Sequence, residues 1–367
     1  MSSIVYGGLD VHKDTIAFCI INTGSGEILE DKLPNDPDRL AKAVRNWKKL
    51  GELHLCYEAS GAGFVIKRLM DKLGVHCEVI APSLIPKAPG DRVKTDKRDA
   101  RKLANLYRAG LLKSVRVPDP EEETVRTLVR LHDQVTKDMT RVKNRVTKYL
   151  GSLGHYFRNG DTWTQKHQAW LKGVPLDEIQ RMIVDTHLKQ LAEFGNQRKI
   201  IDQKIAELAQ SERYQEGVAR LVCFRGIDVY SAMLLLTEIG DAQRFGRAPH
   251  LMSYFGLVPR EVSSGGTHHR GKITKAGSSR ARWVLTEAAW CQIRKPGSSM
   301  RAMKVRESQP AEVVAIAEKA EKRLHSKFWS VALRKDRRTA AIAVAREMTG
   351  FIWAILRVEI RAEKAAA

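Results

Sequence analysis

The spacing of apolar residues predicts a mixed first third of the chain and a helical remainder. Ile4 to Val11 and Thr15 to Asn22 are β-branched and apolar and predict strands, and Glu27 to Leu33 follows a turn signal as a third strand. The next predicted elements are a helix over Asp38–Leu50, a strand over His54–Tyr57, a helix over Phe64–Leu73, a strand over Cys77–Ala81, a proline-rich loop and a helix that begins near Asp96. The predicted order is βββαβαβα.

Two long helical segments are predicted after Pro118 and Pro120. From Glu121 to Leu150 the chain has neither glycine nor proline, and apolar residues recur at helical spacing. A second such run covers Leu176 to Ala209, and an aromatic, irregular connector lies between them. The pair predicts an antiparallel helical hairpin or coiled coil, whose apolar stripe is buried either within the chain or in a dimer.

The last third of the chain is predicted to be mainly helical. A glycine turn at Gly226 precedes an apolar helix over Tyr230–Ile239. The glycine turn and the helices on either side of it form either an ordinary helical hairpin or a site where the backbone amides of the turn hold a DNA phosphate. Further helices are predicted over Ser279–Ile293, Ala311–Leu324 and Arg338–Leu356. We therefore expect domains at residues 1–118, 119–212 and 213–367, and 367 residues suffice for two or three cores.

The charge of the chain indicates a polyanionic partner. Lys and Arg number 63 against 42 acidic residues, a formal net charge of +21, which favours nucleic acid. Residues 260–307 contain 11 Lys or Arg and 3 acids. Within this region, Pro259 to Gly277 combines small, hydroxylated and basic residues with four glycines. We expect a flexible loop that approaches a nucleic acid backbone, and a merely solvated loop is the alternative.

Other classes of protein fit the composition less well. No apolar run approaches the roughly 20 residues that span a bilayer, and no basic-then-apolar signal pattern opens the chain, so we expect a soluble, intracellular protein without a membrane partner. The five cysteines have no CxxC spacing and are expected to be reduced core residues.

Four carboxylates carry the candidate chemistry. Asp96 and Asp99 are three residues apart at the start of a predicted helix, so both project from one face of it. Two neighbouring aspartates repel each other unless a cation such as Mg²⁺ lies between them, although a solvated helix start is the alternative. Asp10 on the first strand and Glu58 at the end of the fourth are expected to meet at adjacent strand ends.

The predicted order is that of the ribonuclease H fold, in which these four positions form one cup. Such a cup suits two metal ions that clamp a phosphodiester, and this convergence favours the metal interpretation. His12 and Lys13 beside Asp10 either hold the local loop or contact phosphate, and neither is assigned a catalytic role.

Several motifs resemble one family, and the resemblance spans nearly the whole chain. They are Gly8-Leu9-Asp10-Val11-His12-Lys13, Tyr57-Glu58-Ala59-Ser60-Gly61, Lys94-Thr95-Asp96-Lys97-Arg98-Asp99-Ala100 and the segment from Phe255 to Gly277. Together they are similar to the DEDD insertion-sequence transposases of the one-ten and eleven-eleven groups. The resemblance implies a RuvC-like N-terminal domain, a coiled coil and a mainly helical C-terminal transposase domain.

The resemblance also implies the site residues. The acids are Asp10, Glu58, Asp96 and Asp99, which would bind Mg²⁺ or Mn²⁺, and the nucleophile is the fifth residue after Pro259, Ser264, next to Ser263. A serine without a neighbouring base needs a partner from elsewhere, and the metal cup is one candidate. The reaction implied is DNA recombination through a covalent enzyme intermediate.

The partners implied are donor and target DNA, a guide RNA made from the flank of the element, and further copies of the chain as a dimer or tetramer. In that family the acids and the serine meet across subunits. The location implied is the prokaryotic cytoplasm, at the nucleoid. Two rival functions stay open: a RuvC-like Holliday-junction or DNA nuclease that hydrolyses DNA without Ser264, and a nucleic-acid-binding protein with an inactive fold.

Overall fold

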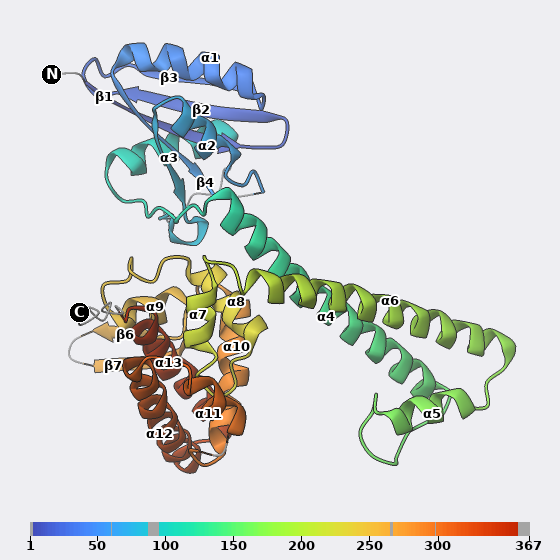
Figure 1. Cartoon of the computed structure of the whole chain (residues 1–367). Helices are drawn as coiled ribbons and strands as arrows, with labels where there is room; N and C mark the ends of the chain where they lie inside the picture. The colour runs from blue at the N-terminus through green and yellow to red at the C-terminus, as the bar shows by residue number, and fades with distance from the viewer. Residues whose placement is uncertain (1–2, 60, 87–94, 265–266, 298, 359–367) are drawn as a thin grey trace, which may run out of the picture. The chain divides into compact units, whose positions relative to one another are not determined.

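The computed structural model of this protein describes residues 3–59, 61–86, 95–264, 267–297 and 299–358. The side chains of residues 262–264 and 267–270 lie outside the description. The chain divides into two compact units, Met1–Pro118 and Asp119–Ala367 (Figure 1). The first unit is a mixed α/β domain, and the second is mostly helical.

The first unit is built on a five-stranded sheet in the order β3-β2-β1-β4-β5. The strands are β1 (Ile4–Val11), β2 (Thr15–Asn22), β3 (Ile28–Pro34), β4 (Glu52–Glu58) and β5 (His76–Ile80). The meander β1 to β3 is antiparallel, whereas β1, β4 and β5 run parallel. The element order predicted from the sequence is therefore confirmed.

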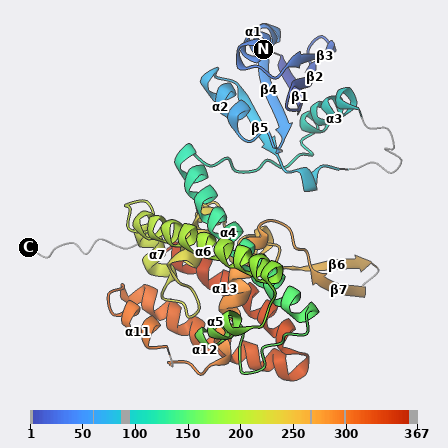
Figure 2. The same ribbon diagram turned by 90° about the vertical axis from the view of Figure 1, so that its right-hand side faces the viewer.

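Helices cover both faces of this sheet (Figure 2). Helices α1 (Pro37–Trp47) and α2 (Val65–Lys72) pack on one face, where Leu40, Val44 and Met70 join a core with Leu9 and Ile20. Helix α3 (Asp96–Arg108) packs on the other face through Ala100 and Ala104, against Ala17 and Cys19. The short 3₁₀ turns η1 (Lys48–Leu50) and η2 (Pro82–Leu84) lie between these elements.

Gly8 lets α3 lie directly on β1. A Cβ atom at Gly8 would stand 2.3 Å from the Ala100 carbonyl oxygen and 2.5 Å from the Ala104 nitrogen, both backbone atoms that a side-chain rotation cannot move. Since side chains alternate along a strand, Asp10 faces the same side of the sheet as Gly8. The close approach at Gly8 therefore brings the start of α3 towards Asp10.

Substituting Gly8 with alanine is expected to loosen α3. The added methyl group forces the helix away from the strand, and such overpacking costs about 1–3 kcal/mol. We expect faster hydrogen exchange of the α3 amides in the full-length protein, with the amides of the second unit unchanged. Gly61→Ala is the matched control, because no atom lies within 4 Å of its added Cβ. Wild-type exchange in Gly8→Ala would contradict the tight approach.

The second unit begins with two long helices that form an antiparallel hairpin (Figure 1). They are α4 (Pro120–Ser152) and α6 (Glu178–Leu208), close to the two predicted runs. The connector, predicted to be irregular, contains the helix α5 (Gln165–Gly173), so that prediction is wrong. Thr164 caps α5, and buried His167 and Leu171 anchor it, contacts that a local apolar pattern does not reveal.

The remaining helices of this unit share one core with the base of the hairpin. They are α7 (Gln215–Leu221), α8 (Val229–Ile239), α9 (Ala248–Tyr254), α10 (Ser279–Trp290) with the turn η3 (Cys291–Ile293), α11 (Met300–Arg306), α12 (Ala311–Arg334) and α13 (Arg337–Leu356). Helix α12 runs ten residues beyond the predicted end at Leu324, because buried Phe328 and half-buried Trp329 continue its apolar face.

Helix α13 corrects one sequence prediction. By length and composition it is apolar enough to cross a membrane, although no run of this kind was expected. Its residues Ala341, Val344, Met348 and Ile352 are fully buried in the core of the second unit. The buried centre of a helical domain needs the same composition, so the apolar residues of α13 are accounted for by packing.

The stretch from Pro259 to Gly277, predicted as a flexible loop, contains an antiparallel hairpin. Its strands are β6 (Pro259–Ser264) and β7 (Thr267–Ile273). The loop prediction is wrong because the two segments pair through their backbones. The pairing continues beyond the paired ends Pro259 and Ile273, where Thr274 N donates to Val258 O at 2.9 Å and Lys275 N to Gly256 O at 3.0 Å. We call residues 259–273 the serine hairpin.

Candidate active site

Asp10 lies next to the last residue of β1, on the α3 side of the sheet. Its Oδ2 atom is 3.1 Å from His12 Nε2, and its side chain is 18% exposed. Burial raises the pKa of Asp10, and the charges of Asp99 and Asp96 raise it further, whereas His12 acts in the opposite direction. Other carboxylates therefore lie close enough to Asp10 to oppose its ionisation.

Asp96 and Asp99 stand in the first turn of α3, as the sequence predicts. Thr95 caps the helix by accepting a hydrogen bond from Arg98 N, and acidic side chains are favoured at this positive end of a helix. Asp96 Oδ2 accepts a hydrogen bond from Lys32 Nζ at 2.5 Å, and its Oδ1 is 3.5 Å from His12 Nε2. The hydrogen bond from Lys32 lowers the pKa of Asp96.

Glu58 ends β4, the parallel neighbour of β1. Leu9 is paired with Tyr57, so Asp10 and Glu58 are the next residues of two adjacent strands. The Glu58 side chain is exposed and faces the α3 side, like Cys56, whose thiol contacts Leu103 O of α3. We call Asp10, Glu58, Asp96 and Asp99 the acid cluster.

One group of potential metal ligands occurs in the part of the chain that the structure describes. Its members are Asp10, His12 and Asp96, whose ligand atoms all lie within 4.8 Å of one another. Asp99 and Glu58 flank this group but are not members of it. Two carboxylates and an imidazole are donors that suit a divalent cation, and the ammonium of Lys32 also binds Asp96.

His12 and Lys32 were not predicted as site residues. For His12 the sequence is compatible with both a loop role and a phosphate contact, and it gives no signal for Lys32 because 64 residues separate Lys32 from Asp96. The alternation of side chains along β3 assigns Lys32 to one face of an edge strand. The sequence alone does not show how β3 pairs with β2, or that α3 packs on the face that carries Lys32.

Ser264 is the last residue of β6 in the second unit, where its backbone pairs with Thr267 and that of Ser263 with His268. Its side chain lies outside the described residues. The base of the serine hairpin is closely packed: a Cβ at Gly277 would stand 2.1 Å from Tyr254 O. Arg282 of α10 donates hydrogen bonds to Phe255 O at 3.1 Å and Ala276 O at 2.5 Å. These contacts fix the two backbone segments from which the serine hairpin extends.

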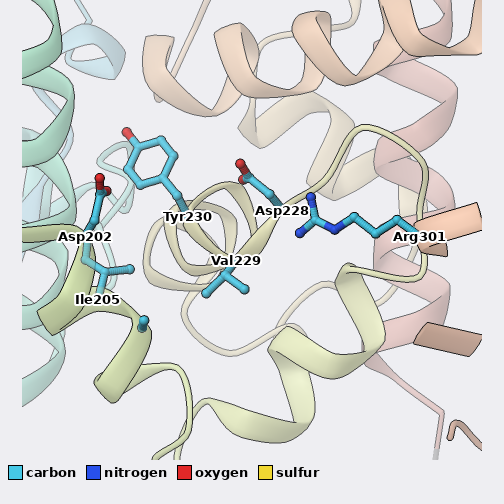
Figure 3. Close-up of a pocket in the computed structure, with 7 residues that line it drawn as sticks. Asp202, Ile205, Asp228, Val229, Tyr230 and Arg301 are labelled. Atoms are coloured by element: carbon cyan, nitrogen blue, oxygen red, sulfur yellow. The ribbon is translucent and has the colours of Figure 1, made fainter. Parts of the chain in front are cut away.

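A pocket of about 260 Å³ lies between α6, the start of α8 and α11 (Figure 3). It is lined by two acids, one arginine and apolar side chains: Asp202, Ile205, Ala206, Asp228, Val229, Tyr230 and Arg301. Asp228 caps α8 by accepting from Ser231 N at 2.8 Å. A carboxylate at this helix start repels phosphate, which favours the ordinary helical hairpin over a phosphate-binding turn.

An α/β unit that carries closely spaced acids, joined to a basic helical unit, has the features of an enzyme that acts on nucleic acid. Two family models match the chain in separate stretches. A DEDD transposase model of the IS110 type covers residues 7–154, and the model of the transposase IS116/IS110/IS902 family covers residues 219–304.

Individual relatives agree with these matches. The transposase for insertion sequence element IS1533 of Leptospira borgpetersenii is 36% identical, over 89% of this chain and 96% of its own length. The y4qE protein of Sinorhizobium fredii, a transposase by name, is 36% identical over 95% of this chain and 88% of its own. The transposase for IS1111A of Coxiella burnetii is 23% identical over 97% of this chain and 90% of its own.

The chain belongs to the IS110 family of DEDD insertion-sequence transposases. This membership implies a DNA partner, transposition of DNA as the activity and use of a divalent metal. It also confirms the resemblance drawn from the sequence motifs.

Proposed function

We propose that this protein transposes DNA by metal-dependent cleavage and rejoining through a serine-linked intermediate. The observation that carries the proposal is the meeting of Asp10 and Asp96 with His12, where the end of β1 faces the first turn of α3. The order of strands and helices supports a ribonuclease H-like, RuvC-like identity for residues 1–118, followed by a coiled coil at 119–212 and a transposase domain at 213–367.

The acid cluster is proposed to hold Mg²⁺ or Mn²⁺. A bound divalent ion would neutralise negative charge on a phosphodiester and position its oxygens. The chain's own contribution would be to present the four acids to that ion: the adjacent strands β1 and β4 carry Asp10 and Glu58, α3 carries Asp96 and Asp99, and Lys32 binds one oxygen of Asp96.

Ser264 is proposed as the nucleophile. Its hydroxyl oxygen forms a bond to phosphorus while the bond to the 3′ oxygen breaks, and that oxygen leaves with a proton as a 3′ hydroxyl. The strand then stays attached to the serine through its 5′ phosphate. Attack by the 3′ hydroxyl of another strand reverses the chemistry and joins new DNA, so no external energy source is required.

The partners of the proposed reaction are donor and target DNA, a guide RNA from the flank of the element, and further copies of the chain as a dimer or tetramer. The net charge of +21 supports binding of such polyanions. Pairing of the RNA with DNA would supply sequence specificity while the protein holds backbones. The expected location is the prokaryotic cytoplasm, at the nucleoid.

A recombination assay tests the proposal. Purified protein, plasmids that carry the element junction and a target, and RNA transcribed from the flank are combined with Mg²⁺ or with excess EDTA. We expect joined products only with metal, and none without the RNA. Products in EDTA would contradict the metal role, whereas products without RNA would contradict the guide alone.

A further inference from the structure

We propose that His12 is a nitrogen ligand of the metal in the acid cluster and gives this site a preference for Mn²⁺ over Mg²⁺. This inference rests on the proposed metal site. It assigns a specific role to a residue that lies beyond the four acids of the cluster.

The turn that carries His12 is held in place. His12 N donates to Thr15 O at 2.9 Å, and His12 O accepts a hydrogen bond from Asn35 Nδ2 at 2.8 Å. The same amide of Asn35 also donates to Lys13 O at 3.3 Å. Three hydrogen bonds thus fix the backbone around His12, and its imidazole lies over the end of β1.

The separation between the imidazole nitrogen of His12 and the carboxylate oxygens of both aspartates is close to that between two ligands of one metal ion. His12 Nε2 is 3.1 Å from Asp10 Oδ2 and 3.5 Å from Asp96 Oδ1. Two ligands of one octahedral ion, each bonded at about 2.1 Å, stand about 3 Å apart. The three side chains therefore need only small movements to bind one cation, and the His12 side chain is exposed enough to admit it.

Lys32 completes the arrangement by holding the other oxygen of Asp96. Because its ammonium binds Oδ2, Oδ1 is left on the side of His12. The ammonium of Lys32 thus orients the Asp96 carboxylate without occupying the proposed metal position.

A nitrogen donor changes which metal the site prefers. Mg²⁺ is a hard ion that takes oxygen ligands and loses water reluctantly, whereas imidazole suits transition metals. Replacing one oxygen ligand by His12 therefore favours Mn²⁺. An acid cluster without this histidine has oxygen ligands alone and gains no such preference.

Direct metal binding tests the inference on the full-length protein without nucleic acid. The affinities for Mn²⁺ and for Mg²⁺ are measured by calorimetry, and pulsed electron paramagnetic resonance detects ¹⁴N coupling to bound Mn²⁺. We expect imidazole ¹⁴N coupling in the wild type that disappears in His12→Asn. Loss of an outer-shell partner alone typically costs about 10- to 100-fold in metal affinity, so loss of the ligand itself should lower the affinity for Mn²⁺ at least about 10-fold in this variant. The affinity for Mg²⁺ should fall much less.

His54→Asn is the matched control. It removes another imidazole of the same unit, one that contacts Glu52 and not the acid cluster, and should bind both metals as the wild type does. Wild-type protein with bound Mn²⁺ but no ¹⁴N coupling, or an equal loss of affinity for both metals in His12→Asn, would overturn the role of His12. If Asp10→Asn binds Mn²⁺ as tightly as the wild type, the proposed metal site itself fails.

Discussion

Replacing Asp99 with asparagine is expected to abolish DNA strand cleavage while DNA and RNA binding persists. Asp99 contributes negative charge next to Asp10, where it raises the pKa of that carboxyl. Asparagine keeps the shape but removes the charge that attracts a divalent cation. Since metal stabilisation supplies several kcal/mol in such reactions, we expect cleavage to slow by about 100-fold or more.

The measurement pairs a cleavage assay on labelled DNA with gel-shift titrations of DNA and RNA. Asp38→Asn is the matched control, because Asp38 is also an acid in the first turn of a helix, α1, on the opposite face of the sheet. It should cleave as the wild type does. Unchanged cleavage by Asp99→Asn would remove Asp99 from the proposed site, and loss of binding in the same variant would indicate a folding defect.

The parts of this region that could be predicted are those set by short-range pattern. The β-branched runs of β1 and β2 and the turn between β2 and β3 indicate an antiparallel meander, and observed strand bounds agree for Ile4–Val11 and Thr15–Asn22. The positions of the four carboxylates on these elements could be predicted because each lies near the end of a strand or in the first turn of a helix. A position of this kind can be predicted from the pattern of a single strand or helix, without knowing how the elements pack.

The parts that could not be predicted depend on contacts between distant segments. His12 is held by Asn35, which follows β3, and Lys32 reaches Asp96 only once α3 lies on the sheet. The serine hairpin was expected to be a loop because residues 259–277 combine small, hydroxylated and basic residues with four glycines. Arg282 of α10 donates hydrogen bonds to two carbonyls at the base of the hairpin, Phe255 O and Ala276 O, and this contact between distant segments leaves no local signal.

Ser264→Ala is expected to eliminate a covalent protein–DNA adduct. If Ser264 attacks the phosphodiester, the cut strand remains bound to protein through its 5′ phosphate, whereas hydrolysis leaves free ends. Reactions on 5′- and 3′-labelled DNA are stopped and run on denaturing gels. A slowly migrating, protease-sensitive band should require both metal and Ser264, and only the label downstream of the cut, joined to the 5′ phosphate, should enter it.

Ser263→Ala is the matched control for this assignment. It removes the hydroxyl of the adjacent residue in the same strand, β6, and should keep the band. Asp10→Asn should lose the band although its serine is intact, since the acid cluster is proposed to position the phosphate. A band that tracks Ser263 would move the nucleophile by one residue and leave the mechanism standing. Cleavage with free ends in both serine variants would contradict the serine intermediate and favour hydrolysis by a RuvC-like nuclease.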